Sequence, residues 1–240
     1  MMYPELSGKV AVISGAGGNL GRAVARRLRA ENARLALIDI NEQALQAFVQ
    51  EQGWPQETVL IGAVDLTRKD EVDRFIERVT ATFEAIDILV NVAGGFKTGL
   101  SYEMEERDWD FLMNLNARSA FLLSAAVVRT MLEKNRQGRI INIAARAALA
   151  GSAGLSAYSA SKAAVLRLTE SMAAELLEHG ITVNAVLPSI IDTPQNRQAM
   201  PNADYIKWVA PESLADVIAF LASESARDIS GAGIPVYGRA

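Results

Sequence analysis

The sequence predicts one α/β domain with a doubly wound parallel sheet of about seven strands and helices on both faces. Short runs rich in Val, Ile and Leu recur along the chain, which is typical of strands buried on both faces. The segments between them carry apolar residues at helical spacing, so strand and helix alternate and right-handed crossovers follow. The 240 residues, half of them hydrophobic, can bury one large core and contain no obvious interdomain linker.

The expected strands come in a regular order along the chain. They are Val10 to Ile13, Leu35 to Ile40, Val59 to Ala63, Ile88 to Val90, Ile140 to Ile143 and Val183 to Leu187, with a last strand near Ile234 to Tyr237. One stretch, at about 189–210, lacks clear periodicity and precedes a helix that begins near Pro211. Because loops of this length in compact domains tend to cover a site, we expect a substrate lid there.

Composition excludes several classes of function. The net charge of −4, without any run of Lys or Arg, does not favour nucleic acid or a membrane surface as a partner. The absence of cysteine excludes thiolate chemistry and disulfides, and no cluster of ligands predicts a metal site. The single histidine, His179, precedes Gly180 at an expected helix end, where a structural role is favoured. Without a recognisable signal peptide or an apolar run of membrane length, we expect a cytoplasmic protein.

A glycine-rich segment directly follows the first strand and opens a helix. Such a turn lets the backbone approach a pyrophosphate at the positive end of the helix, and this position makes dinucleotide binding a better interpretation than an ordinary turn. The residues expected to contact the cofactor here are Ser14, Gly15, Gly17, Asn19, Leu20 and Gly21.

This segment resembles the Thr-Gly-x-x-x-Gly-apolar-Gly pattern of the short-chain dehydrogenase/reductase family, whose domain is Rossmann-like. Asn19 stands where the family has its middle glycine. Because Asn is the residue that best tolerates left-handed backbone after glycine, we expect cofactor binding to survive this change.

Asp39 ends the second strand, 18 residues after Gly21, and Ile40 follows it. A carboxylate there can accept hydrogen bonds from both hydroxyls of the adenine ribose and would repel a 2′-phosphate. NAD is therefore favoured over NADP as the cofactor. The alternative is that Asp39 only caps the helix beginning at Asn41.

Two further segments extend the resemblance. Asp65 and Leu66, after the third strand, resemble the family's adenine-contacting pair, although Asp65 could also cap the next helix. Asn91, Ala93 and Gly94, after the fourth strand, resemble the family's Asn-Asn-Ala-Gly segment beneath the cofactor.

Tyr158 and Lys162 form the expected chemical centre. Four residues apart on a helix, a phenol and an ammonium share one face and can interact. Because a free phenol has a pKa of about 10, it needs a nearby positive charge to exchange protons at neutral pH. The predicted chemistry is hydride transfer at a nicotinamide coupled to proton transfer through Tyr158. Alone, the pair could be a surface pair, but it follows the cofactor motifs in the family's order.

The resemblance implies roles for other residues. Lys162 would also bind the nicotinamide ribose, Asn116 would hold a water that links Lys162 to solvent, and Thr193, five residues after Pro188, would contact the carboxamide. From the residues alone, Asn116 could be a helix-interior amide bonded to backbone, and Thr193 could form a turn.

The sequence departs from the family at its catalytic Ser, 13 residues before the Tyr, where this chain has Ala145. Losing one donor to a developing oxyanion commonly costs about 10²- to 10³-fold in rate. Either another donor such as Ser152 or Ser156 compensates, or the substrate does not need it.

Several segments resemble quinonoid dihydropteridine reductases, which also lack this Ser. These are Ala144 to Leu149, Leu187 to Arg197, and Met200 to Tyr205 followed by Trp208. A quinonoid pterin is a conjugated diimine whose nitrogen can take a proton directly. Three lid residues, Met200, Tyr205 and Trp208, would either form a wall over the substrate or pack as the lid's own small core.

We therefore expect an NAD(H)-dependent short-chain oxidoreductase acting on a small organic substrate, either a pterin-like diimine or a ketone or alcohol. A rival of another class is an NAD-binding sensor that has lost catalysis, but a binding module would not need both Tyr158 and Lys162. The resemblance also implies a homo-oligomer, a tetramer or dimer built through the helices containing Asn116 and Tyr158 and the C-terminal strand.

Overall fold

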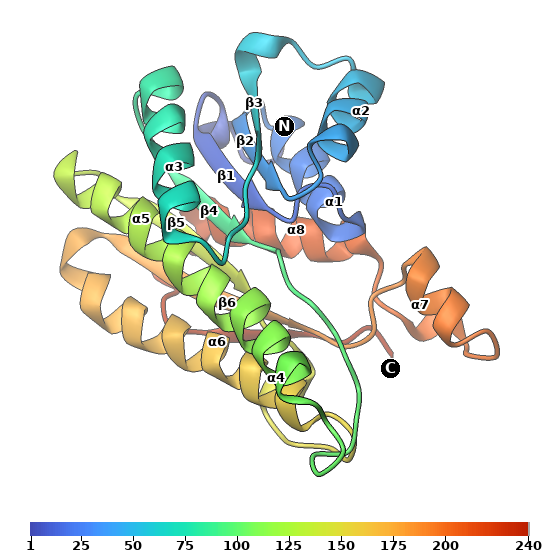
Figure 1. The fold of residues 1–240 in the computed structure, drawn as a ribbon. Helices are drawn as coiled ribbons and strands as arrows, with labels where there is room; N and C mark the ends of the chain where they lie inside the picture. The colour runs from blue at the N-terminus through green and yellow to red at the C-terminus, as the bar shows by residue number, and fades with distance from the viewer. Residues whose placement is uncertain (240) are drawn as a thin grey trace.

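The computed structural model describes residues 1–239, which form a seven-stranded parallel sheet covered on both faces by helices (Figure 1). The strand order is β3-β2-β1-β4-β5-β6-β7, so the predicted doubly wound architecture is confirmed. The strands are β1 (Val10–Ser14), β2 (Arg34–Asp39), β3 (Val59–Ala63), β4 (Ile88–Asn91), β5 (Gly138–Ile143), β6 (Ile181–Pro188) and β7 (Gly233–Val236). Each predicted strand is present, and no end differs from its predicted position by more than two residues.

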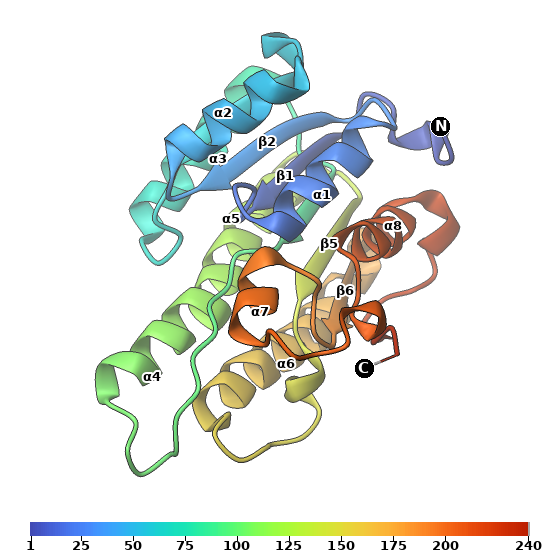
Figure 2. The same ribbon diagram turned by 90° about the vertical axis from the view of Figure 1, so that its right-hand side faces the viewer.

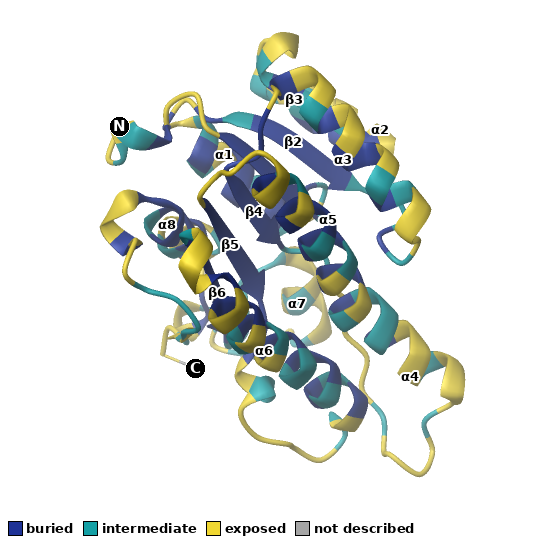
Figure 3. Cartoon of the chain, turned by 90° about the vertical axis from the view of Figure 1, so that its left-hand side faces the viewer, coloured by how far each residue is buried: buried dark blue, intermediate teal, exposed yellow. Residues whose placement is uncertain are grey.

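The helices lie in two layers. They are α1 (Asn19–Arg29), α2 (Glu42–Gln52), α3 (Lys69–Phe83), α4 (Glu106–Leu112), α5 (Ser119–Glu133), α6 (Ser156–Leu176), α7 (Pro194–Ala199) and α8 (Pro211–Ala222). Apolar side chains of α1, α2 and α8 share one core cluster with the sheet, and those of α3, α5 and α6 share another on the opposite face. Figure 3 shows the buried strands between these two layers. Burial of the strands on both faces explains their continuous apolar runs.

The strand order reverses between β1 and β4. β1 pairs with β2 on one side and with β4 on the other, all parallel, so the connections after these strands leave the sheet in opposite directions. In open α/β sheets this reversal opens a crevice at the carboxyl ends of the strands, where ligands bind. All the predicted site segments follow carboxyl ends of strands or lie in helices beside them.

A helical run from Glu106 to Glu133 joins α4 to α5 through a π turn at Met113–Arg118. By length and composition it could cross a membrane, but 44% of its most apolar window is buried within the molecule. A core helix of a globular domain has the same properties, and this run packs against α3 and α6. Its apolar character is therefore explained by the fold.

Candidate active site

Ser14, the last residue of β1, joins β1 to the segment after β4, at the place where the strand order reverses. Its Oγ accepts hydrogen bonds from the backbone N–H groups of Val92 and Ala93, at 3.1 and 3.2 Å. The hydroxyl is buried and therefore fixes the chain after β4 against the start of the glycine-rich loop. Ser14 was predicted to contact the cofactor, and here its side chain holds the floor of the crevice.

Two glycines make the loop between β1 and α1 compact. Gly15 has a φ of +63°, and a Cβ there would lie 2.8 Å from the Ala93 nitrogen. A Cβ at Gly21 would lie 2.2 Å from the Gly15 carbonyl oxygen. The helix then begins after Gly18 without a side-chain cap. Its first turn thus keeps backbone N–H groups free of side-chain acceptors, as an anion at a helix N-terminus requires.

Asp39 lies beside this loop, at the carboxyl end of β2. Its Oδ2 accepts from the Gly17 N–H at 3.0 Å, and its Oδ1 accepts from the Asn41 N–H at 3.1 Å. The cap of α2 is Asn41, whose side chain accepts from Ala44, so a purely capping role for Asp39 is wrong. Ile40 is 71% exposed next to it, as an apolar surface beside the carboxylate.

Asp65 is held by its own turn. Its Oδ1 accepts from the N–H and the hydroxyl of Thr67, at 2.9 and 2.7 Å, and the hydroxyl bond lowers the pKa of Asp65. Helix α3 begins later, with Arg68 as its N-cap, so Asp65 does not cap it. Leu66 is buried. The predicted adenine contact of this pair stays a prediction.

Asn91 directs its amide into the protein. The Nδ2 donates to Ser124 at 2.8 Å and to Asn142 at 2.7 Å, and Asn142 in turn donates to Thr169. This buried chain links β4, α5, β5 and α6 directly under the crevice. Asn91 is thus placed to support the site from below, while the following Ala93 and Gly94 lie at the surface of the crevice.

Asn116 lies in the π turn and is 1% exposed. Its Oδ1 accepts from the Gly95 N–H at 2.8 Å, and its Nδ2 donates to the Gly95 carbonyl at 3.1 Å and to the Ser161 hydroxyl at 2.9 Å. Isolated π turns often mark functional sites. The amide joins the loop after β4 to α6, and it bonds to backbone, as the alternative had it, although this backbone belongs to Gly95 in another segment.

Lys162 lies one turn after Tyr158 on α6 and is 5% exposed. Its Nζ donates to the Ile143 carbonyl at 2.8 Å. A Cβ at Gly94 would lie 3.2 Å from this Nζ and 2.7 Å from the Asn116 Oδ1, so glycine lets the three residues meet. Burial lowers the pKa of Lys162 to about 8. The interpretation as a surface pair is therefore wrong.

Tyr158 is half-buried beside Phe96. The two rings meet edge to face, with centroids 4.8 Å apart and planes at 83°. Burial raises the pKa of Tyr158 to about 12, so the phenol is protonated at neutral pH. Phe96 itself is 61% exposed. The pair thus places a proton donor beside an exposed apolar ring.

Ala145 lies just past β5 and is buried, so position 145 supplies no hydroxyl. The two suggested substitutes, Ser152 and Ser156, are exposed. Ser159, beside Tyr158 in sequence, has a buried hydroxyl without a partner among the described residues, and it lines a hollow of about 250 Å³ with Ala147 and neighbours. No contact of these serines with Tyr158 supports a replacement donor.

The segment predicted to be a lid, at about 189–210 and called the lid below, follows β6, which ends at Pro188. Thr193 caps α7 by accepting from the Asn196 N–H at 3.2 Å, so its turn-forming role is present, and the carboxamide contact stays a prediction. Tyr205 packs on Trp208, with ring centroids 4.8 Å apart, and Trp208 is 8% exposed. Of the two interpretations given for the lid residues, the contact between these two rings favours the second, in which they pack as the lid's own small core.

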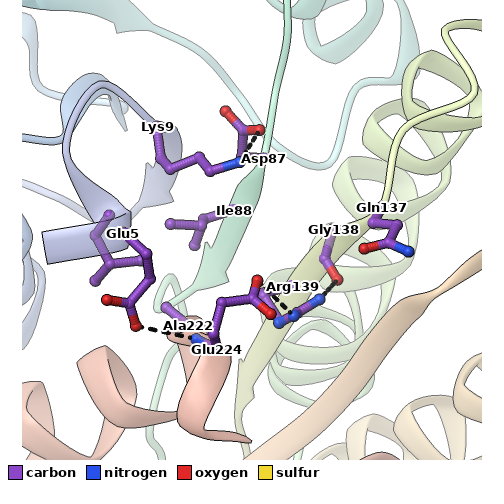
Figure 4. A pocket seen from close by; sticks show the side chains of 10 residues that line it. Glu5, Lys9, Asp87, Ile88, Gln137, Gly138, Arg139, Ala222 and Glu224 are labelled. Carbon is purple, nitrogen blue, oxygen red and sulfur yellow. Dashed lines mark hydrogen bonds and ion pairs between the residues drawn. The ribbon is translucent and has the colours of Figure 1, made fainter. Parts of the chain in front are cut away.

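Two other features lie outside the crevice. His179 is exposed in a 3₁₀ turn before Gly180, whose φ of +66° ends the helix, as predicted. No cluster suited to a metal ion occurs in residues 1–239. A small polar hollow of about 60 Å³, lined by Lys9, Asp87 and Arg139, lies where strands begin, at the opposite edge of the sheet (Figure 4).

Sequence reasoning missed the partners of the central residues. Ser161 accepts from Asn116 and donates to the Tyr158 carbonyl, and the Ile143 carbonyl holds Lys162. Ser161 stands within the Tyr158 to Lys162 motif, but its small polar side chain carries no signal by itself. The contacts of Ser161 with Asn116 and of Lys162 with Ile143 join residues distant in sequence, so spacing could not reveal them.

Comparison with known proteins identifies the family of the chain. The family model described as short chain dehydrogenase matches residues 9–204. The chain is 35% identical to (3R)-3-hydroxyacyl-CoA dehydrogenase of Mus musculus, covering 98% of this chain and 96% of that protein. It is 34% identical to the 3-oxoacyl-[acyl-carrier-protein] reductase FabG of Thermotoga maritima, covering 98% of both.

A solved structure shares the whole architecture. An NAD⁺-bound xylitol dehydrogenase superposes with a TM-score of 0.89 at 29% identity, covering 98% of this chain and 99% of that one. The chain belongs to the short-chain dehydrogenase family and is an oxidoreductase.

Proposed function

We propose that this protein is an NAD(H)-dependent oxidoreductase that moves hydride between the nicotinamide and a small organic substrate, with Tyr158 as its acid and base. The observation that carries the proposal is the placement of half-buried Tyr158 and buried Lys162, one turn apart on α6. Lys162 lies beside Gly94, in the segment after β4, and the Ser14 hydroxyl bonds that segment to the end of β1, where the glycine-rich loop begins. The proton donor and the loop that would hold the dinucleotide thus lie at the same end of the sheet.

The chain fits a dinucleotide. The close contacts of Gly15 and Gly21 leave no room for side chains, and α1 begins uncapped behind them, which suits a pyrophosphate. Asp39 would hold the adenine ribose, with Ile40 and the Asp65–Leu66 pair near the adenine. Lys162 and Thr193 would hold the nicotinamide half. A bound nicotinamide would supply or accept the hydride.

The proton is handled by Tyr158. Because its pKa is raised to about 12, the phenol holds its proton at neutral pH and can donate it to a substrate during reduction. The phenolate left behind needs a counter-charge in a site of low polarity, and protonated Lys162 supplies it. Asn116 fixes the Gly95 backbone and Ser161 next to this pair. Its predicted link to solvent through a water remains part of the proposal.

Asp39 is expected to set the choice between NAD and NADP. Replacing it with Asn should lower kcat/KM for NADH by about tenfold to a hundredfold, because a hydrogen bond to a charged group contributes about 1.5 to 3 kcal/mol. The same change should raise kcat/KM for NADPH, since it removes the repulsion of a 2′-phosphate. Steady-state kinetics with both cofactors checks this, and Asp228→Asn, on an exposed surface, is the control. An unchanged preference would contradict the assignment.

A second candidate, reduction of a pterin-like conjugated diimine, is favoured by two observations. Ala145 offers no hydrogen bond to a substrate oxygen, and the exposed Phe96 ring beside Tyr158 offers an apolar edge to a planar heterocycle. A diimine nitrogen can take the proton from Tyr158 directly. A ketone would need a donor that Ala145 lacks.

The test is NADH oxidation, followed at the nicotinamide absorbance, with quinonoid dihydropterin beside ketones and 3-oxoacyl thioesters. Turnover of any of these supports the oxidoreductase, and turnover of the pterin alone supports the second candidate. Ala145→Ser should raise carbonyl turnover by about 10- to 100-fold, because it restores one donor at the developing oxyanion. NADH binding without turnover of any substrate would instead favour the sensor class.

We also propose that the chain forms a dimer or tetramer in the cytoplasm. Exposed Trp109, Phe111 and Phe121 on the run of α4 and α5, and the open edge of β7, support an assembly surface. The expected contacts involve the helices that carry Asn116 and Tyr158.

A further inference from the structure

A side-chain hydrogen bond joins the glycine-rich loop to the lid. The Nδ2 of Asn19, the first residue of α1, donates to the Oε1 of Gln195 in α7 at 2.8 Å. Figure 2 shows α7 beside the start of α1, although 176 residues separate the partners in sequence. In the family's pattern position 19 is a glycine, which has no side chain to reach the lid. This bond is therefore a property of this chain.

The lid around α7 is built as one firm unit. Arg197 donates twice to the Asp192 carboxylate, at 2.6 and 2.7 Å, and Asn196 donates to the Ile191 carbonyl at 2.7 Å. At its base, the Asp192 N–H donates to the Val209 carbonyl at 2.8 Å. Because these contacts join α7 to the rest of the lid, we expect Gln195 to move together with the lid.

The contact itself is a weak one. Gln195 is exposed and Asn19 half-exposed, and theirs is the one hydrogen bond between α7 and the loop in residues 1–239. A neutral hydrogen bond that water can replace adds only a small net stability, so it can open and re-form. Asn19 also stands where a pyrophosphate would meet the N-terminus of α1. Opening this bond would free the lid from the part of the loop that holds the cofactor.

We propose that Asn19 and Gln195 form a latch that holds the lid closed over the phosphate-binding loop and slows release of the dinucleotide. The proposal rests on NAD(H) binding in the proposed function. Gln195 acts as a positioning residue through the lid. In reactions of this kind product release often limits turnover, so the latch would tune kcat through cofactor release.

The test measures NADH dissociation by stopped-flow fluorescence for Gln195→Ala, Asn19→Gly and the double variant. Each single change should speed dissociation by about two- to tenfold, since one exposed hydrogen bond is lost. The double variant should match the faster single variant, because both changes break the same bond. Gln198→Ala, exposed in the same helix, is the matched control and should not alter the rate.

Hydrogen exchange of α7 without cofactor gives a second readout. Faster exchange in Gln195→Ala and Asn19→Gly, at unchanged melting temperature, is expected. If the wild type binds NADH but both variants keep its NADH dissociation rate and its hydrogen exchange in α7, the latch is wrong and the proposed function still stands. A wild type that does not bind NADH would overturn the proposed function, and the latch with it.

Discussion

Replacing Tyr158 with Phe should lower kcat/KM by about 10²- to 10⁴-fold, the usual contribution of one general acid or base. The change removes only the hydroxyl, and the ring keeps its edge-to-face contact with Phe96. NADH should therefore still bind with nearly unchanged affinity, as measured by fluorescence titration. Steady-state kinetics with the best substrate of the panel gives the loss of turnover.

Tyr102→Phe is the matched control, because Tyr102 is 80% exposed and lies outside the crevice. It should leave both turnover and binding unchanged. If Tyr158→Phe turned over at the wild-type rate, the proton would have to come from elsewhere, and the proposed mechanism would be wrong.

Replacing Lys162 with Met should lower kcat by about 10²- to 10³-fold, because the charge that stabilises the developing phenolate is lost. In the wild type, burial lowers the pKa of Lys162 to about 8, so this charge disappears as the pH rises through 8. The kcat/KM for reduction should therefore fall above about pH 8, and that fall should be absent in the variant. A pH profile of the free enzyme measures both. Lys134→Met, on the surface, is the control.

Unfolding by urea separates this loss from misfolding. The pKa of Lys162 is lower in the folded chain, about 8, than its ordinary value of 10.5. Between these values the unfolded chain binds more protons, so the contribution of Lys162 to stability increases as the pH rises. Lys162→Met should lack this increase and should be at least as stable as the wild type at pH 7, since a buried cation is removed. A variant less stable than the wild type at pH 7 would contradict the assigned cost of burial.

The fold was predictable because its signals are local. Strands buried on both faces are mostly apolar, as Val10–Ser14 and Ile181–Pro188 are, so their positions could be inferred without any knowledge of their partners. Gly15 and Gly21 could also be predicted from the glycine-rich pattern after the first strand. The structure gives the reason for these glycines, since a Cβ at either position would meet backbone atoms. Tyr158 and Lys162 could be paired because both stand on one helix, where four residues make one turn.

Hydrogen bonds between side chains and groups that are distant in sequence could not be predicted in this way. The bonds of Asn116 to Gly95 and Ser161, of Lys162 to the Ile143 carbonyl, and of Asn19 to Gln195 depend on how distant elements pack. Asn91 shows the same limit, because its motif suggested the cofactor while its amide faces Ser124 and Asn142.

The sequence by itself thus determined the layers of the fold, and it predicted the edge of the sheet and the two residues on which the proposed chemistry rests. Periodicity, turn chemistry and helical spacing are properties of neighbouring residues, and they act before the chain is compact. The tertiary structure alone decided the burial of Lys162 and Tyr158, and hence their shifted pKa values. Desolvation depends on the atoms that surround a group, and those atoms come from strands and helices far apart in the chain.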